Sequence, residues 1–452
     1  MSAAMDRSSL TPRRRRRGFP LALALLAVAI ALSACQSNRS LPDGISYAGT
    51  PRPATEVRFL RDESWVDENG ERHVDQQIFD AVFAIIAGAE RLIVVDMFLY
   101  NDSQGPVPET TRALSSELTE ALLARKGERP ALEVVVITDP VNTLYGGLVA
   151  EHLERLSAAG VTVVTTDLTE LPDSNPAWSI IWRPFIQPFG NSPGGLLPNP
   201  IGDGKVSFRS YFALFNFKAN HRKTILADRG DGFVAIVSSA NPHDGSSAHR
   251  NAAIEFNGPA VADLLTTENA VLAFSGAPTV APLEPVSRER GAVTVEVLTE
   301  GRIARALLDA IDGAAPGDEV RLMMFYLSDR RVVEALERAQ ARGVTVRLIL
   351  DPNKDAFGRE KSGIPNRPVA RELTDAGVPV RWCNTQGEQC HAKMILIDRA
   401  SGESVLISGS ANFTRRNLGD YNLETDVAVH GPATSRVLAD AREYFDSAWR
   451  ND

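Results

Sequence analysis

The chain has 452 residues, which is enough for two or three domain-sized cores, and its 44% hydrophobic and 7% aromatic content is that of a globular protein. The formal net charge is −9; removal of residues 1–34, which hold six arginines and one aspartate, would leave 42 basic and 56 acidic residues and a net charge of −14. This acidity argues against a broad nucleic-acid-binding surface, because such surfaces neutralise phosphates with Lys and Arg.

The first element in chain order is an export signal. Arg13 to Arg17 form a basic region, and an apolar run from Phe19 to Ala34 follows that is short for a transmembrane helix. Its end, Leu-Ser-Ala-Cys at residues 32–35, resembles a bacterial lipobox. In that resemblance residues 1–34 are a lipoprotein signal peptide, and Cys35 is lipidated. We expect residues 35–54, which are polar and lack hydrophobic periodicity, to be a tether, with the protein on the periplasmic face of a membrane of the bacterial cell envelope, including the outer membrane as a destination.

The rest of the chain is an internal repeat. In each half a helical pattern leads into an apolar strand, at residues 92–98 and 320–325, and a later strand ends in Asp-Pro, at Asp139 and Asp351. Short apolar strands that alternate with amphipathic helices predict an α/β fold. We therefore predict a first half over residues 55–280 and a second half over residues 281–452, each an α/β/α sandwich, packed around one shared active site.

The first half carries an insert. The Asp-Pro pairs are 212 residues apart but His221 and His391 only 170, so 42 extra residues fall in roughly 167–215. Aromatic residues among prolines and glycines argue against disorder there. Two interpretations stay open: the aromatic side chains pack on their own domain, or they form a wall of the active site or enter the bilayer interface.

The chemical signature occurs twice. Each half contains a His-x-Lys-x4-Asp sequence, then a [Gly/Ser]-Ser-x-Asn element, and later a glutamate. Residues two apart on a strand face the same side, so each His and its Lys share a face. The residues are His221, Lys223, Asp228, Ser239, Asn241 and Glu255 in the first half, and His391, Lys393, Asp398, Ser410, Asn412 and Glu424 in the second.

These paired motifs resemble the phospholipase D superfamily over essentially all of the chain after the tether, apart from Ser238, which stands where the family usually has glycine. The resemblance implies that one histidine attacks phosphorus to give a phosphohistidine while the other protonates the leaving group; we assign His221 as the nucleophile and His391 as the acid/base. The lysines and asparagines would hold the non-bridging oxygens, with Ser239 and Ser410 adding hydrogen bonds to substrate. Glu255 and Glu424 would each orient an imidazole, and Asp228 and Asp398 would be structural.

The function expected from this resemblance is hydrolysis of membrane phospholipids or phosphatidyl transfer as in cardiolipin synthases, with no metal or other cofactor required because lysines supply the charge. A superfamily endonuclease and a non-catalytic lipid-binding lipoprotein are the alternatives. Cys383 and Cys390 flank the loop before His391 and form either a disulfide or two free thiols. We expect the other histidines, including His243 and His249, to lie on the surface or in loops.

Overall fold

The computed structural model describes residue 28 and residues 39–105, 111–283, 291–356 and 359–450. The expected signal peptide and Cys35 lie outside these ranges, apart from Val28. Within the ranges, no helix combines the length and the apolar character needed to cross a membrane.

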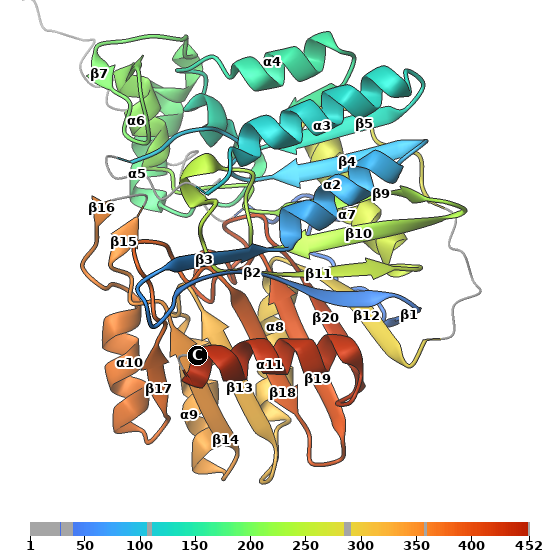
Figure 1. Ribbon diagram of the computed structural model, residues 1–452. Coiled ribbons are helices and arrows are strands. Elements are labelled where there is room, and N and C mark those ends of the chain that lie inside the picture. Colours follow the sequence, from blue (N-terminus) through green and yellow to red (C-terminus); the bar gives the residue numbers. More distant parts are fainter. Residues whose placement is uncertain (1–27, 29–38, 106–110, 284–290, 357–358, 451–452) are drawn as a thin grey trace, which may run out of the picture.

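Two eight-stranded sheets form the body of the molecule, one above the other in Figure 1. The first has the order β3-β2-β11-β10-β9-β4-β5-β6. Its strands are β2 (Val57–Val66), β3 (Arg72–Gln76), β4 (Leu92–Met97), β5 (Glu133–Thr138), β6 (Thr162–Thr165), β9 (Lys223–Arg229), β10 (Gly232–Ser238) and β11 (Asn251–Asn257). The strands β4, β5 and β6 are parallel, and the remaining pairings are antiparallel.

The second sheet repeats this arrangement, with the order β1-β12-β20-β19-β18-β13-β14-β17. Its strands are β1 (Arg52–Ala54), β12 (Val293–Thr299), β13 (Glu319–Met324), β14 (Thr345–Leu350), β17 (Val380–Trp382), β18 (Lys393–Asp398), β19 (Glu403–Gly409) and β20 (Thr425–Pro432). From β12 to β17 each strand has a counterpart in the first sheet, in the same order and direction. The repeat read from the sequence is therefore confirmed as a repeated fold.

Alternation of side chains sorts each strand between two cores. Along β4, Val94 faces a core shared by both sheets, whereas Ile93 and Val95 face a separate outer core. Helices cover the outer faces: α2 (Ile78–Gly88), α3 (Leu114–Glu128) and α4 (Glu151–Ala158) on the first sheet, and α8 (Gly301–Asp312), α9 (Arg330–Ala341) and α10 (Asn366–Asp375) on the second. The shared core also takes side chains of α7 (Ala260–Phe274) and α11 (Arg436–Arg450).

The tether prediction is wrong for residues 45–54. Ile45 is fully buried in the shared core, and β1 pairs with β12 as the edge strand of the second sheet. A polar segment without periodicity can still dock when one or two apolar side chains enter a core formed by other elements. The N-terminal segment therefore belongs to the second sheet although it precedes the first half in sequence.

The insert is folded. It contains α5 (Pro176–Phe185), β7 (Leu197–Pro198), β8 (Lys205–Val206) and α6 (Phe208–Leu214), which lie together at one corner of the molecule in Figure 1. A two-stranded hairpin of the second half, β15 (Asp355–Ala356) and β16 (Arg359–Glu360), lies just below it. Single turns of 3-10 helix complete the chain at Pro140–Thr143, Leu168–Glu170, Gln187–Phe189 and Asp244–Ser246.

Candidate active site

The two histidine motifs start the equivalent central strands β9 and β18, and the backbone joins the two halves at this point. The amide of His221 donates to the carbonyl of Leu423 at 2.8 Å, and the amide of His391 donates to the carbonyl of Arg250 at 2.8 Å. Each histidine is thus held by the opposite half of the chain. The site requires both halves, as the repeat predicted.

The Asp-Pro aspartates brace the segments that carry the histidines. Oδ2 of Asp139 accepts a hydrogen bond from the amide of Asn220, and Oδ2 of Asp351 accepts one from the amide of Cys390, both at 2.7 Å. Both carboxyls are buried. They fix the residue before each histidine, which limits the freedom of the imidazoles.

A cavity of about 320 Å³ receives both imidazoles. His221, Asn241, His391 and Asn412 line it, as expected from the paired motifs. Further lining residues that the motifs did not identify are Phe98, Leu99, Asn101, Ser103, Val141, Ile201, His243, Ser246, His249, Phe325, Tyr326, Lys361 and Gln389. His243 and His249 lie in the loop between β10 and β11, as one part of the prediction had it, but both are buried beside the catalytic motifs and not on the surface.

The two lysines are fully buried beside their histidines and are not among the residues that line the cavity. Nζ of Lys223 donates to the carbonyl of His221 at 2.5 Å, and Nζ of Lys393 donates to the carbonyl of His391 at 2.7 Å. Each ammonium also lies over the ring of a phenylalanine that packs on the neighbouring imidazole: Phe98 at 5.0 Å from Lys223, and Phe325 at 5.3 Å from Lys393. The two phenylalanines follow the matching strands β4 and β13, so the repeat itself was the signal that could have found them.

The partners of the two imidazoles differ. Nδ1 of His221 lies 2.9 Å from Oε2 of Glu424, and Nδ1 of His391 lies 3.0 Å from Oδ1 of Asn251. Both oxygens are acceptors, so each Nδ1 carries the proton and each Nε2 carries the free lone pair. Glu424 therefore has the orienting role that was predicted, although it acts on the histidine of the opposite half.

The role predicted for Glu255 is wrong. Its carboxylate binds Arg58 at 2.9 Å and Arg229 at 3.2 Å, away from the cavity. Strand register explains the error: Ser238 pairs with Ala253, and Gly409 pairs with Asp426, so Asn251 is the counterpart of Glu424. The loop before Asn251 is two residues shorter than the loop before Glu424, and an asparagine stands in place of the glutamate. For both reasons the sequence alone did not identify Asn251 as the equivalent residue.

Ser239 and Ser410 do not reach substrate, contrary to expectation. Both are fully buried; the hydroxyl of Ser239 donates to Oδ1 of Asn251 at 3.0 Å, and the hydroxyl of Ser410 donates to the carboxylate of Glu424. These serines hold the partners of the imidazoles. Asp228 is structural, as predicted, since it accepts from the amides of residues 90–92; Asp398 likewise binds Ser404, Arg321 and Arg442.

Burial and the paired lysines set the protonation of the free site. Burial, together with the lysine charges, lowers the pKa of His221 to about 4 against the opposing effect of Glu424, and the same causes hold the pKa of His391 well below its usual range. Burial lowers the pKa of Lys223 to about 7, and burial with repulsion from Lys223 lowers the pKa of Lys393. An anion between the lysines would raise all four pKa values, so the site favours an anionic ligand.

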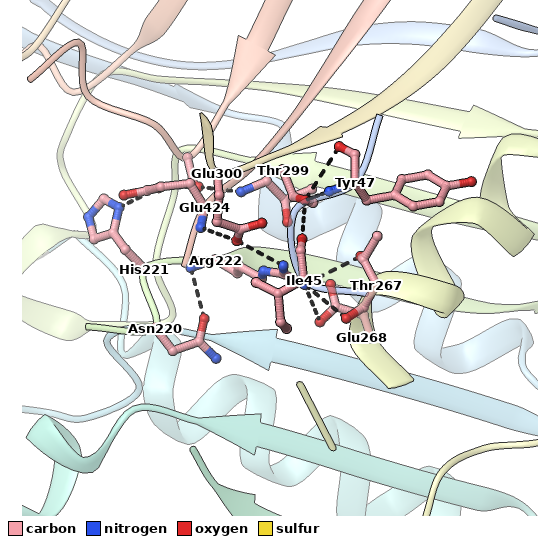
Figure 2. A network of polar contacts seen from close by, with 12 residues as sticks. Ile45, Tyr47, Asn220, His221, Arg222, Thr267, Glu268, Thr299, Glu300 and Glu424 are labelled. Carbon is pink, nitrogen blue, oxygen red and sulfur yellow. Dashed lines mark hydrogen bonds and ion pairs between the residues drawn. The ribbon is translucent and has the colours of Figure 1, made fainter. Parts of the chain in front are cut away.

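A buried ionic network lies beside His221. Figure 2 shows Arg222, the next residue, with its guanidinium toward Glu300 and Glu268; Nη2 lies 2.9 Å from Oε1 of Glu300, and Nη1 lies 3.4 Å from Oε2 of Glu268. Oε1 of Glu300 also accepts from the amide of Glu424 at 3.0 Å. In the second half Ala392 takes the place of Arg222, so no equivalent guanidinium stands beside His391.

The loop before His391 has a covalent constraint of its own. Cys383 and Cys390 form a disulfide, and both are buried. The disulfide closes the loop that ends at His391 and carries Gln389, which lines the cavity. Of the two alternatives left open for these cysteines, the structure has the disulfide.

The comparisons with known proteins agree with this geometry. Residues 307–449 match the family model described as "Cardiolipin synthase, PLD-like domain". The chain is 26% identical to cardiolipin synthase A of Pseudomonas aeruginosa over 363 residues, which are 78% of this chain and 61% of that protein, so it spans less than two thirds of this curated relative. The crystal structure of phosphatidylserine synthase from Haemophilus influenzae Rd KW20 has a similar fold, with a TM-score of 0.55, 12% identity, and coverage of 94% of this chain and 90% of that one.

These matches, together with the two HxKx4D motifs, the repeated sheets and the shared cavity between them, support membership of the chain in the phospholipase D superfamily.

Proposed function

We propose that this protein cleaves the phosphodiester bond of membrane phospholipids and transfers the phosphatidyl group to water or to an alcohol. The observation that carries the proposal is the convergence of two sets of His, Asn and Lys. Each His and Asn lines one cavity, each Lys is buried against the carbonyl of its own His, and each free imidazole has an Nε2 lone pair. A diester needs a nucleophile, a proton donor for the leaving alkoxide and positive charge around its oxygens, and the two sets supply all three.

In the proposed reaction Nε2 of His221 attacks phosphorus, and the bond from phosphorus to the headgroup oxygen breaks. The bound diester, an anion, raises the pKa of His391, so Nε2 of this histidine takes up a proton from water. His391 gives that proton to the leaving oxygen, and the headgroup leaves as an alcohol. His391 then takes a proton from water or an acceptor hydroxyl, whose oxygen attacks phosphorus and breaks the phosphorus–nitrogen bond. The product is phosphatidate with water, or a new phosphatidyl ester with an alcohol.

Charge supports this division of roles. A histidine bonded to phosphorus through Nε2 is positively charged while Nδ1 keeps its proton, and the carboxylate of Glu424 stabilises that charge better than a neutral amide does. Asn251 leaves His391 easier to deprotonate, as a group that passes a proton in both directions requires. Lys223, Lys393, Asn241 and Asn412 would hold the non-bridging oxygens.

The lipid class of the substrate is also part of the proposal. Supporting it are the names of the two relatives, both of which are phospholipid synthases, and the rings of Phe98 and Phe325 inside the cavity. Lipidation at Cys35 and a place on the periplasmic face of an envelope membrane would bring the site to its substrate. The acidic composition speaks against a nuclease, which would hold a polyanion.

Lipid mass spectrometry tests the proposal. The full-length chain is incubated with vesicles of phosphatidylglycerol and phosphatidylethanolamine, beside His221→Ala and His391→Ala variants. Cardiolipin or phosphatidate that forms with the native chain and not with either variant is the expected result; cardiolipin indicates transfer and phosphatidate alone indicates hydrolysis. Folded native protein that forms neither product, while cleaving DNA or binding lipid without turnover, would contradict the proposal.

A further inference from the structure

The insert exposes an unusual amount of apolar surface. Of the fourteen large hydrophobic side chains that are exposed in the described residues, seven fall between residues 181 and 217. We call them the apolar insert face: Ile181, Phe185, Phe189, Leu196, Phe208, Phe215 and Phe217. Phe189 is 80% exposed and Leu196 is 83% exposed, which is far beyond the partial exposure usual for such residues.

The exposure is organised by the two helices of the insert. In α5, Trp182 turns inward while Ile181 and Phe185, one turn apart, face outward. In α6, Ala213 is buried while Phe208 and the next residue after the helix, Phe215, face outward. A surface helix normally directs polar side chains to solvent, so helices that are apolar on both faces need a covering layer.

The insert carries few charged residues. Residues 167–215 hold three basic residues, Arg183, Lys205 and Arg209, and four acidic ones, of which Asp173 is buried and paired with Arg183 and Lys218. Arg416 of the second half adds a guanidinium 4.3 Å from the ring of Phe217. An aromatic-rich face with few charged residues suits the interfacial layer of a bilayer, where apolar bodies meet the lipid headgroups.

Two further observations relate the insert to the active site and to the expected anchor. Ile201, which belongs to the insert but not to the apolar insert face, lines the cavity that holds His221 and His391, so the insert forms part of the wall of the active site. Arg39 forms an ion pair with Glu170, at the start of the insert. Cys35 lies only four residues before Arg39, so an anchor there could be no more than about 14 Å from it along the chain.

We propose that the apolar insert face docks into the interfacial layer of a lipid bilayer and thereby turns the mouth of the active site toward the membrane. The reason for facing the bilayer rests on the proposed phospholipid activity, but docking is a separate physical event that can be measured without turnover. Aromatic rings suit this position because they combine apolar bodies with a tolerance for the polar headgroup region.

Fluorescence quenching tests the docking directly. The full-length chain is incorporated into vesicles of phosphatidylglycerol and phosphatidylethanolamine with brominated acyl chains, which quench tryptophan at short range. The Phe189→Trp variant adds a reporter on the face, and Ser401→Trp adds a matched reporter at an exposed turn beyond the far end of β18 from His391. We expect the fluorescence added at position 189 to be quenched at least about threefold more than that added at position 401; equal quenching would overturn the proposal.

Activity supplies the second readout. A Phe189→Asp/Leu196→Asp variant should lose at least about tenfold in kcat/KM on vesicles, yet keep its rate on a monomeric short-chain phospholipid, since the cavity is untouched. Val66→Asp, an exposed hydrophobic outside the insert, should leave both rates unchanged. Equal loss on both substrates, or dissociation of an oligomer by the double variant, would contradict membrane docking. Strong quenching in a chain that turns over no lipid would instead leave docking intact and refute the proposed function.

Discussion

The two halves of the site have equivalent lysines, which would bind the charged substrate, but different hydrogen-bond partners for their histidines. Lys223 and Lys393 make the same contact with the carbonyl of their own histidine. In contrast, His221 has a carboxylate partner and His391 an amide. Equivalent lysines suit a phosphate held between the halves, whereas unequal partners suit two histidines with unequal tasks. The features that repeat therefore identify the site, and the features that differ assign separate roles to the two histidines.

The largest expected effect is the loss of turnover when either histidine is replaced. His221→Ala should lower turnover at least about 10⁴-fold on phospholipids and on a p-nitrophenyl phosphodiester alike, because no nucleophile remains. His391→Ala should lose about 10²- to 10⁴-fold on phospholipids but retain the first release of p-nitrophenolate, which needs no proton. Stopped-flow absorbance measures that first release; its loss in both variants alike would contradict the division of roles.

The next effect concerns stability. Arg222→Met should lower the free energy of unfolding by about 3–5 kcal/mol, since it leaves Glu268 and Glu300 buried without their cation. Arg58→Met is the matched control, because Arg58 is a largely exposed partner of Glu255 and its loss should cost about 1 kcal/mol or less. Urea unfolding compares the two variants. An equal free energy of unfolding would show that the network beside His221 does not stabilise the fold.

Substitution of the residues that hydrogen-bond the imidazoles should lower kcat by a smaller factor, and by a different factor for each histidine. Glu424→Gln removes the carboxylate from His221 and should lower kcat about 10- to 100-fold. Asn251→Asp adds a carboxylate to His391; it should change kcat less than about tenfold while raising the pKa of His391, which NMR titration follows. A larger kcat loss in Asn251→Asp than in Glu424→Gln would reverse the assignment of nucleophile and acid.

The mildest test is the pH profile. With a pKa near 7, Lys223 loses its charge in the free protein as the pH rises above 7, so kcat/KM on a monomeric substrate should fall by up to about tenfold per pH unit there. The pKa of His221 is about 4, so this histidine stays neutral across the same range. Lys223→Arg, whose charge persists, should move the fall to higher pH. A flat profile between pH 6 and 9 would contradict the role of this lysine.

The sequence predicted the parts of the site that repeat with a fixed pattern. His221, Lys223, Asn241 and their counterparts follow strand alternation, which a repeat makes visible. Asn251 was missed because its place depends on the register of β10 and β11 across a shorter loop. Phe98 and Phe325 read as core residues, since an apolar residue at a strand end has no chemical pattern of its own.

The position of the N-terminal segment also depends on tertiary packing that the local sequence does not reveal. Composition indicated a tether up to residue 54, but Ile45 enters the shared core and β1 joins the second sheet. Docking of a short segment depends on a cavity made by distant elements, and local sequence does not describe that cavity. The direction in which the insert aromatics face is likewise a tertiary property.

The most direct test of the central claim is to trap the covalent intermediate. The His391→Ala variant is mixed with a p-nitrophenyl phosphodiester, quenched under alkaline conditions and digested for peptide mass spectrometry. We expect a singly esterified phosphoryl group joined to Nε2 of His221 by a phosphorus–nitrogen bond, because the first step proceeds while the second lacks its base. A modified His391 in the His221→Ala variant, or no adduct on His221 despite a burst of p-nitrophenolate, would contradict it.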